Sequence, residues 1–181
     1  GDHGKVYGIT SQDMVSKMRQ YIHLAHVITP NLTEASLLLD EKYPSDIADI
    51  QIKKWLIRLA ELGPGTVIIT SVPASDLLEN YTCVVAYDRA ENQFWKMRSK
   101  RIPANFPGTG DAFTSVIVGS LVCGENLKSA LQRSINFLEQ GITYSFQQRT
   151  PEKEGILLER FLDSSTNIGR SSKKYLTWEN L

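Results

Sequence analysis

The stretch Val67-Ile68-Ile69-Thr70-Ser71 decides the fold of this chain. An unbroken run of β-branched residues is typical of a central parallel strand that is covered on both faces. The turn residues Gly63-Pro64-Gly65 precede it and end an amphipathic helix predicted over residues 46–62. Thr70 and Ser71 then place two hydroxyl groups at the predicted C-terminal edge of the strand.

Outward from this strand, helical and extended patterns alternate along the chain. The segment 25–29, which stops at Pro30, is predicted as a second buried strand, and 81–87 and 93–98 are predicted as an antiparallel hairpin. Helices are predicted over 12–24, 33–39, 110–123, 126–147 and 153–163, and Asn126 is predicted as the cap of the helix over 126–147. In the helix over 46–62, Ile50 and Leu62 are expected to point inward with the other apolar residues. The order predicts an α/β fold with a mostly parallel sheet and helices on both faces.

Length and composition predict one domain over residues 1–163 and a polar C-terminal tail over 164–181. The 181 residues are 41% apolar, enough to bury a sizeable core. Their 20 basic and 20 acidic residues form no basic block, so neither a nucleic acid nor a membrane is expected as a partner. Cys83 and Cys123 are expected in the core of a protein from a reducing compartment, and the absence of a long apolar run predicts a cytoplasmic location.

The motif Gly108-Thr109-Gly110-Asp111 precedes an apolar, helix-compatible run. A turn that exposes backbone N–H groups at a helix N-terminus favours an anion such as phosphate. Asp111 would compete for the same positive end unless phosphate and carboxylate approach from different sides. That arrangement suits phosphoryl transfer to a hydroxyl group.

Three groups of candidate residues are expected beyond the carboxyl ends of the strands, where ligands bind in open α/β sheets. They are Thr29-Pro30-Asn31 after one strand, Thr70 and Ser71 after another, and Gly108 to Asp111 at a helix start. Glu34 lies three residues after Asn31, at the same loop-to-helix corner. It is either an ordinary first-turn acid of the helix or a residue that acts at a cation.

In this order the three groups resemble the ribokinase-like superfamily of small-molecule kinases. Ile28-Thr29-Pro30-Asn31-Leu32-Thr33-Glu34-Ala35 looks like the segment that places an Asn and a Glu near magnesium-bound phosphates. Within the superfamily, the opening Gly-Asp-His-Gly-Lys-Val-Tyr together with residues 67–71 is most similar to the pyridoxal and pyridoxamine kinases. The resemblance runs from Gly1 to about Leu162. It implies that an N-terminal portion precedes this chain, with much of the vitamer pocket and part of a homodimer contact.

The resemblance implies ATP-dependent phosphorylation of the 5′-hydroxyl of pyridoxal, pyridoxamine or pyridoxine. Asp111 would be the base, and the amides of Gly108, Thr109 and Gly110 would form the anion hole. Glu34 would act through Mg²⁺, and a monovalent cation such as K⁺ is a further expected cofactor. The ATP-binding residues implied are Asp2, Tyr7, Thr29, Asn31, Thr70 and Ser71.

The sequence leaves two other functions open. One is a hydroxymethylpyrimidine kinase of thiamine synthesis, whose Thr-Pro-Asn-Leu segment is similar but which commonly has Cys at the position of Asp111. The other is a non-catalytic nucleotide-binding module.

Overall fold

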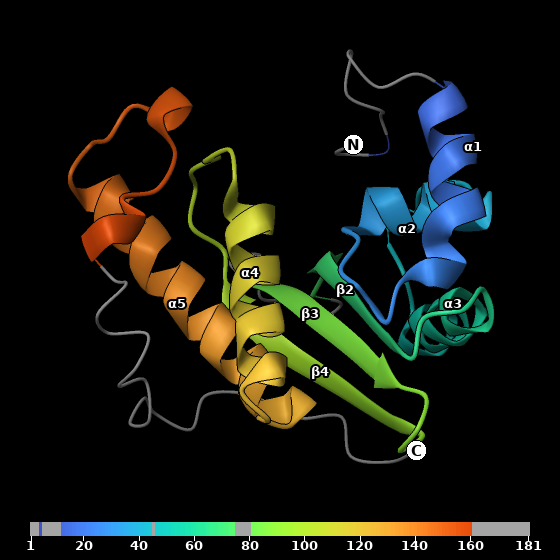
Figure 1. Cartoon of the computed structure of the whole chain (residues 1–181). Coiled ribbons are helices and arrows are strands. Elements are labelled where there is room, and N and C mark those ends of the chain that lie inside the picture. Colours follow the sequence, from blue (N-terminus) through green and yellow to red (C-terminus); the bar gives the residue numbers. More distant parts are fainter. Residues whose placement is uncertain (1–3, 5–11, 45, 75–80, 161–181) are drawn as a thin grey trace. The chain divides into compact units, whose positions relative to one another are not determined.

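The computed structural model describes residue 4 and residues 12–44, 46–74 and 81–160 (Figure 1). The tail predicted from residue 164 onward lies outside these residues, as do Asp2 and Tyr7. The described chain divides into two compact units, with the boundary between Arg98 and Ser99. The first unit carries the predicted strands, and the second carries the helix that follows Gly108.

The elements of the first unit follow the predicted alternation of helix and strand. The predicted helices over 12–24, 33–39 and 46–62 are confirmed, and so are the early strand before Pro30 and the hairpin. In chain order the elements are α1 (Gln12–Tyr21), a 3₁₀ turn (Ile22–Leu24), β1 (Val27–Ile28), α2 (Leu32–Leu39), α3 (Asp49–Glu61), β2 (Thr66–Pro73), β3 (Tyr81–Asp88) and β4 (Gln93–Lys100), whose last residues cross the boundary.

The strands form one sheet in the order β1-β2-β3-β4, which makes β2 a central strand as predicted. β1 and β2 are parallel, with Val27 opposite Thr66, whereas β2 and β3 are antiparallel, with Val67 opposite Tyr87. The α/β class is confirmed. In its described part the sheet is mixed rather than mostly parallel, because the hairpin of β3 and β4 extends it beyond β2.

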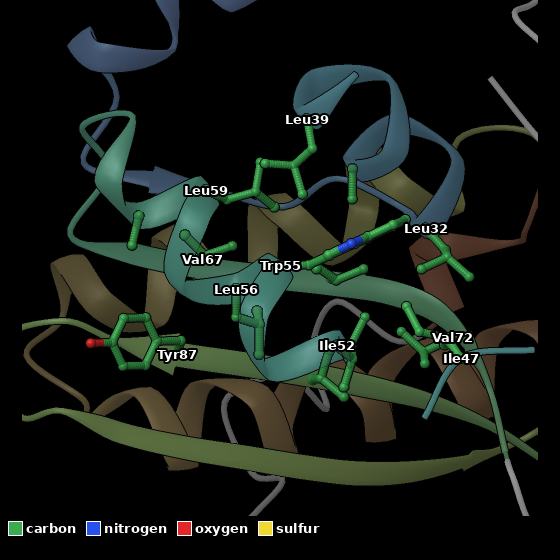
Figure 2. Packing of buried hydrophobic residues seen from close by; sticks show 14 of the residues in the cluster. Leu32, Leu39, Ile47, Ile52, Trp55, Leu56, Leu59, Val67, Val72 and Tyr87 are labelled. Carbon is green, nitrogen blue, oxygen red and sulfur yellow. The ribbon is translucent and has the colours of Figure 1, made fainter. Parts of the chain in front are cut away.

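A cluster of buried side chains lies where α2 and α3 pack against β2 (Figure 2). Trp55, Leu56 and Leu59 lie on one side of α3, and each is at most 2% exposed. Val67 and Ile69 alternate along β2 and belong to the same cluster. Burial of one such leucine contributes roughly 1.5–3 kcal/mol, so this cluster fixes how α3 lies against β2.

Two apolar residues of the helix over 46–62 do not point inward as predicted. Ile50 is 69% exposed and Leu62 is 40% exposed. Ile50 precedes the buried Ile52 by two residues, which places it about 200° away around the helix. Leu62 is the C-cap, where the helix has already ended. The apolar stripe on α3 is therefore narrower than its composition indicates.

The second unit is built around two helices, α4 (Thr109–Val122) and α5 (Leu127–Gln147), which pack against each other. Both helices are predicted from the sequence, and the predicted cap of α5 is confirmed. The Oδ1 atom of Asn126 accepts a hydrogen bond from the N–H of Ser129 at 2.9 Å. The side chains of Phe106, Ala112, Phe137 and Ile156 form a buried cluster that holds this unit together.

The helix predicted over 153–163 is wrong within the described residues. Two 3₁₀ turns, Glu152–Glu154 and Leu158–Arg160, occupy its place. Gly155 lies between them with φ of 76°, a left-handed conformation that interrupts a right-handed helix. The N–H of Leu157 instead donates to the Oγ atom of Ser145 on α5, at 2.9 Å.

The two cysteines differ in their surroundings. Cys83 on β3 is buried, as predicted, but Cys123 is exposed directly after α4, which contradicts its predicted place in the core. Cys123 is the C-cap, at the end where the apolar face of the helix stops. Within the described part of the chain, no helix combines the length and apolarity needed to cross a bilayer.

Candidate active site

The corner between β1 and α2 is organised by a reciprocal pair of hydrogen bonds. The Oδ1 atom of Asn31, the N-cap of α2, accepts the N–H of Glu34 at 2.9 Å, and the Oε2 atom of Glu34 accepts the N–H of Asn31 at 3.0 Å. This arrangement is a capping box, which satisfies two backbone donors that a helix start otherwise leaves without a partner. The two residues that resemble a magnesium and phosphate site thus also stabilise the helix on which they lie.

β2 brings Thr70 beside this corner. The N–H of Thr70 donates to the carbonyl oxygen of Pro30 at 3.0 Å, and Thr70 and Asn31 form a parallel β-bridge. Thr29 directly follows β1, two residues before the bridge. The predicted neighbourhood of residues 29–31 and Thr70 is therefore present within the first unit.

Ser71 lies in an irregularity of β2 that the sequence does not predict. Ile69 pairs with Val85 and Val72 pairs with Cys83, so three steps along β2 match two steps along β3. This extra residue is a β-bulge. Ser71 is exposed and has φ of 58°, in the left-handed region that non-glycine residues seldom adopt. The strand therefore continues to Pro73 instead of ending at Ser71.

The first unit thus gathers oxygen atoms of the kind that hard cations and phosphates prefer. Among the described residues, no three Asp, Glu, His or Cys side chains cluster as an all-protein metal cage requires. Mg²⁺ in nucleotide sites uses only one or two protein carboxylates and completes its shell with phosphate oxygens and water. The single carboxylate of Glu34 fits that mode of binding.

The start of α4 is organised differently. Its N-cap is Gly108, with φ of 84° and ψ of −1°, and no side chain makes a capping hydrogen bond there. The first intrahelical bond runs from the N–H of Ala112 to the carbonyl oxygen of Gly108 at 2.9 Å. The N–H groups of the preceding residues, Thr109, Gly110 and Asp111, have no acceptor within the helix. They give this end of α4 a positive potential.

Space is open around the backbone of this turn. Apart from the adjoining backbone, a Cβ atom added to Gly108 or to Gly110 would meet no heavy atom of the described residues within 4 Å. Packing among the described residues does not account for either glycine. The positive φ of Gly108 explains the first glycine, whereas the open space at Gly110 is consistent with the close approach of a ligand to the backbone.

Asp111 lies in the first turn of α4 with its side chain exposed. It lies at a groove of about 720 Å³ between α4 and α5, whose lining also includes Ser115, Gly119 and Phe137. The Oγ atom of Ser115 donates to the carbonyl oxygen of Asp111 at 2.8 Å, a contact that binds this turn to the next. Ser115 was not among the predicted site residues. The signal for it in the sequence is its position four residues after Asp111, at which a Ser hydroxyl in a helix can reach the earlier carbonyl oxygen.

The predicted site residues therefore fall into two groups that lie in different units. Thr29, Asn31, Glu34, Thr70 and Ser71 are neighbours in the first unit, and Gly108 to Asp111 form one turn in the second. That the two groups meet at a single site stays a prediction.

Comparison with known proteins agrees with this arrangement of residues. Residues 7–154 match the phosphomethylpyrimidine kinase family, whose match covers most of the chain. The chain belongs to the phosphomethylpyrimidine kinase family. The predicted resemblance to small-molecule kinases of the ribokinase-like superfamily, pyridoxal kinases among them, is thereby confirmed.

The chain is similar both to an enzyme of thiamine biosynthesis and to a pyridoxal kinase. The chain is 32% identical over 123 residues to the thiamine biosynthetic bifunctional enzyme TH1 of Arabidopsis thaliana, a match that covers 67% of this chain and 22% of that enzyme. It is 30% identical over 138 residues to the pyridoxal kinase of Homo sapiens, covering 70% of this chain and 42% of that kinase.

A solved structure shows the same fold over nearly the whole chain. A candidate phosphomethylpyrimidine kinase from Bacteroides thetaiotaomicron, crystallised in an orthorhombic form with pyridoxal, is 44% identical with a TM-score of 0.88. The match covers 98% of this chain and 61% of that protein. The chain thus spans less than half the length of the two curated relatives and less than two thirds of the solved one.

Proposed function

We propose that this protein transfers the γ-phosphoryl group of ATP to the 5′-hydroxyl of pyridoxal, pyridoxamine or pyridoxine. The observation that carries the proposal is the start of α4. There, one turn combines an uncapped set of N–H donors with the exposed carboxylate of Asp111. The N–H donors can stabilise the negative charge of a phosphoryl group in transfer. The carboxylate can accept the proton of an attacking hydroxyl.

In this proposal each part of the turn has its own role. Asp111 orients the acceptor hydroxyl and takes its proton as the oxygen attacks phosphorus. The amides of Gly108, Thr109 and Gly110 stabilise the charge that develops on the phosphoryl oxygens. They are already fixed by the helix, so they need little reorganisation during the reaction.

The corner at β1 and α2 supplies the second part of the proposal. In this proposal Asn31 and Glu34 hold the metal and phosphates, and Mg²⁺, when bound, would offset the charge of the phosphate oxygens. The hydroxyl groups of Thr70 and Ser71 would donate hydrogen bonds to the phosphates, and Thr29 would lie near a monovalent cation such as K⁺. Asp2 and Tyr7, proposed as further ATP-binding residues, lie outside the described residues.

The vitamin B6 acceptor is supported by two similarities. The solved relative that is 44% identical was crystallised with pyridoxal, and human pyridoxal kinase is 30% identical. A homodimeric assembly, which rests on the resemblance, and a cytoplasmic location, which rests on the composition of the sequence, belong to the same proposal.

A hydroxymethylpyrimidine acceptor is a second candidate, because TH1 of Arabidopsis thaliana is 32% identical and the family description names a pyrimidine kinase. Asp111 argues against it, since the related pyrimidine kinases commonly carry Cys there. Phosphate transfer to each acceptor, measured with the same protein, separates the two candidates. ATP binding without transfer to either acceptor would instead support a nucleotide-binding module.

The decisive experiment compares Asp111→Asn with the original chain in an ATP-dependent assay with pyridoxal. Loss of the base should lower turnover by about 10²–10⁴-fold, while ATP affinity stays within about twofold. Asp13→Asn is the matched control, because Asp13 is an exposed acid in the first turn of α1. Turnover of the Asp111 variant close to that of the control would refute the assignment of the base.

A further inference from the structure

Gly4 is held against the first turn of α2 by a contact that spans 29 positions of the sequence. Its N–H donates to the Oγ1 atom of Thr33 at 3.0 Å. Thr33 is only 2% exposed, so its hydroxyl has little access to water. Loss of this hydrogen bond would leave a buried oxygen without its donor, which costs free energy. The contact therefore restrains the position of Gly4.

The side chain of Tyr43 lies close to Gly4. A Cβ atom at Gly4 would lie 2.9 Å from both the Cβ and the Cγ atom of Tyr43, closer than real side chains approach. Gly4 also has φ of 76°, a conformation that other residues adopt only with strain. Tyr43 itself packs against the core cluster of the first unit. Glycine is therefore required at this position by both space and backbone conformation.

The position of Thr33 on α2 gives this contact its meaning. Thr33 lies between Asn31 and Glu34, the two residues that form the capping box at the start of the helix. The Oγ atom of Ser36 donates a hydrogen bond to the carbonyl oxygen of Thr33 at 2.7 Å. The turn is therefore bonded internally as well. Gly4 thus contacts the same helical turn that carries the proposed metal and phosphate residues.

We propose that Thr33 and Tyr43 are positioning residues, whose hydroxyl and ring together dock Gly4 on the first turn of α2 and so hold that turn in its ligand-binding geometry. This inference rests on the proposed function, because it assigns the docked turn to MgATP. Neither residue touches the ligand in this scheme. Each acts through Gly4 and through Asn31 and Glu34.

The test uses Thr33→Val, which keeps the shape of the side chain and removes the acceptor. We expect hydrogen exchange at the Gly4 amide to become at least about tenfold faster, and the Kd for MgATP measured by calorimetry to rise about fivefold. Thr33→Ser restores a hydroxyl and should return both quantities to within about twofold of the original values.

Ser134→Ala is the matched control, since it removes another buried hydroxyl, which donates to the carbonyl oxygen of Ala130 within α5 at 2.9 Å and takes no part in the turn of Thr33. It should lower the melting temperature by an amount similar to Thr33→Val but leave Gly4 exchange and the Kd for MgATP unchanged. If Ser134→Ala weakened MgATP binding as much as Thr33→Val, the effect would be general destabilisation and the proposal would be overturned.

Failure of the proposed function gives a different result. If the original chain did not bind MgATP at all, the proposed function would fail, whereas Gly4 exchange would still decide whether Thr33 docks Gly4. If Thr33→Val accelerated Gly4 exchange but bound MgATP like the original chain, docking would be real and its positioning role would be refuted.

Discussion

The first turns of α2 and α4 solve the same structural problem in opposite ways. Both begin a helix whose leading N–H groups have no intrahelical acceptor. At α2 the capping box of Asn31 and Glu34 satisfies two backbone N–H groups with side chains of the chain itself. At α4 the N-cap is Gly108, which offers no side-chain acceptor. The comparison teaches that side chains cap the start of α2, whereas the start of α4 leaves its donors available to a ligand.

The two solutions have different energetic consequences. A side-chain cap contributes about 1 kcal/mol to stability, which the start of α4 forgoes. The turn at Gly108 instead keeps its donors exposed, with open space around them. In stability alone, a capping side chain at the start of α4 would be the better choice. The absence of one fits a turn shaped by what it binds.

Among the tests of this comparison, the largest expected effect comes from closing the open space at α4 with Gly110→Ala. Apart from the adjoining backbone, the new Cβ atom would meet no atom of the described residues within 4 Å, so stability should hold or rise by up to about 1 kcal/mol. The same atom would keep the phosphoryl group from the amides, and turnover should fall about 10²-fold. Denaturant unfolding together with the phosphorylation assay measures both quantities.

Gly108→Ala sharpens this test, because the same substitution at φ of 84° should cost about 1–2 kcal/mol of stability. If Gly110→Ala were as destabilising as Gly108→Ala, Gly110 would be a structural glycine. The interpretation of α4 as an open anion site would then lose its support.

A smaller effect is expected when the cap of α2 is removed with Asn31→Ala. Asn126→Ala is its matched control, because each Asn accepts a backbone N–H three residues ahead at 2.9 Å. Both variants should lose about 1 kcal/mol in chemical denaturation. Only Asn31→Ala should also raise the KM for MgATP, by about tenfold, because it removes a hydrogen bond to a charged ligand.

Equal KM values in the two cap variants would mean that Asn31 serves the helix alone. The contrast between α2 and α4 would then become sharper, with Glu34 as the one remaining candidate ligand residue of the capping box.

The smallest expected effect is that of Glu34→Gln, which separates the two roles of one side chain. Glutamine also forms a capping box, so the loss of stability should stay below about 1 kcal/mol. Removal of the negative charge should raise the Mg²⁺ concentration needed for half-maximal turnover about fivefold. A Mg²⁺ titration at saturating ATP measures this shift, and an unchanged midpoint would remove Glu34 from the metal site.

Much of the fold is predictable from local sequence signals. The cap at Asn126 and the buried run of β2 depend on neighbouring residues and were found where expected. Gly155 interrupts the last predicted helix because a single positive φ outweighs an otherwise compatible pattern. The exposure of Ile50 reflects the angular position of one residue, which composition does not encode.

The candidate site is predictable in its motifs but not in its contacts. The spacing of Asn31 and Glu34 carries the signal of a capping box, which the resemblance to a metal site obscured. The contact of Gly4 with Thr33 has no such signal, because 29 positions separate the two residues. The bulge at Ser71 is equally hidden, since it depends on pairing with β3.

The bulge in β2 is, in effect, a one-residue insertion into a regular strand. Val67, Ile69 and Val72 all belong to the same core cluster, although the last step has odd spacing. If Ser71 were deleted, Val72 would follow Ile69 with the alternation of an ordinary strand and would still face the core. The core thus imposes no need for the extra residue, and the chain there is one residue longer than its packing requires.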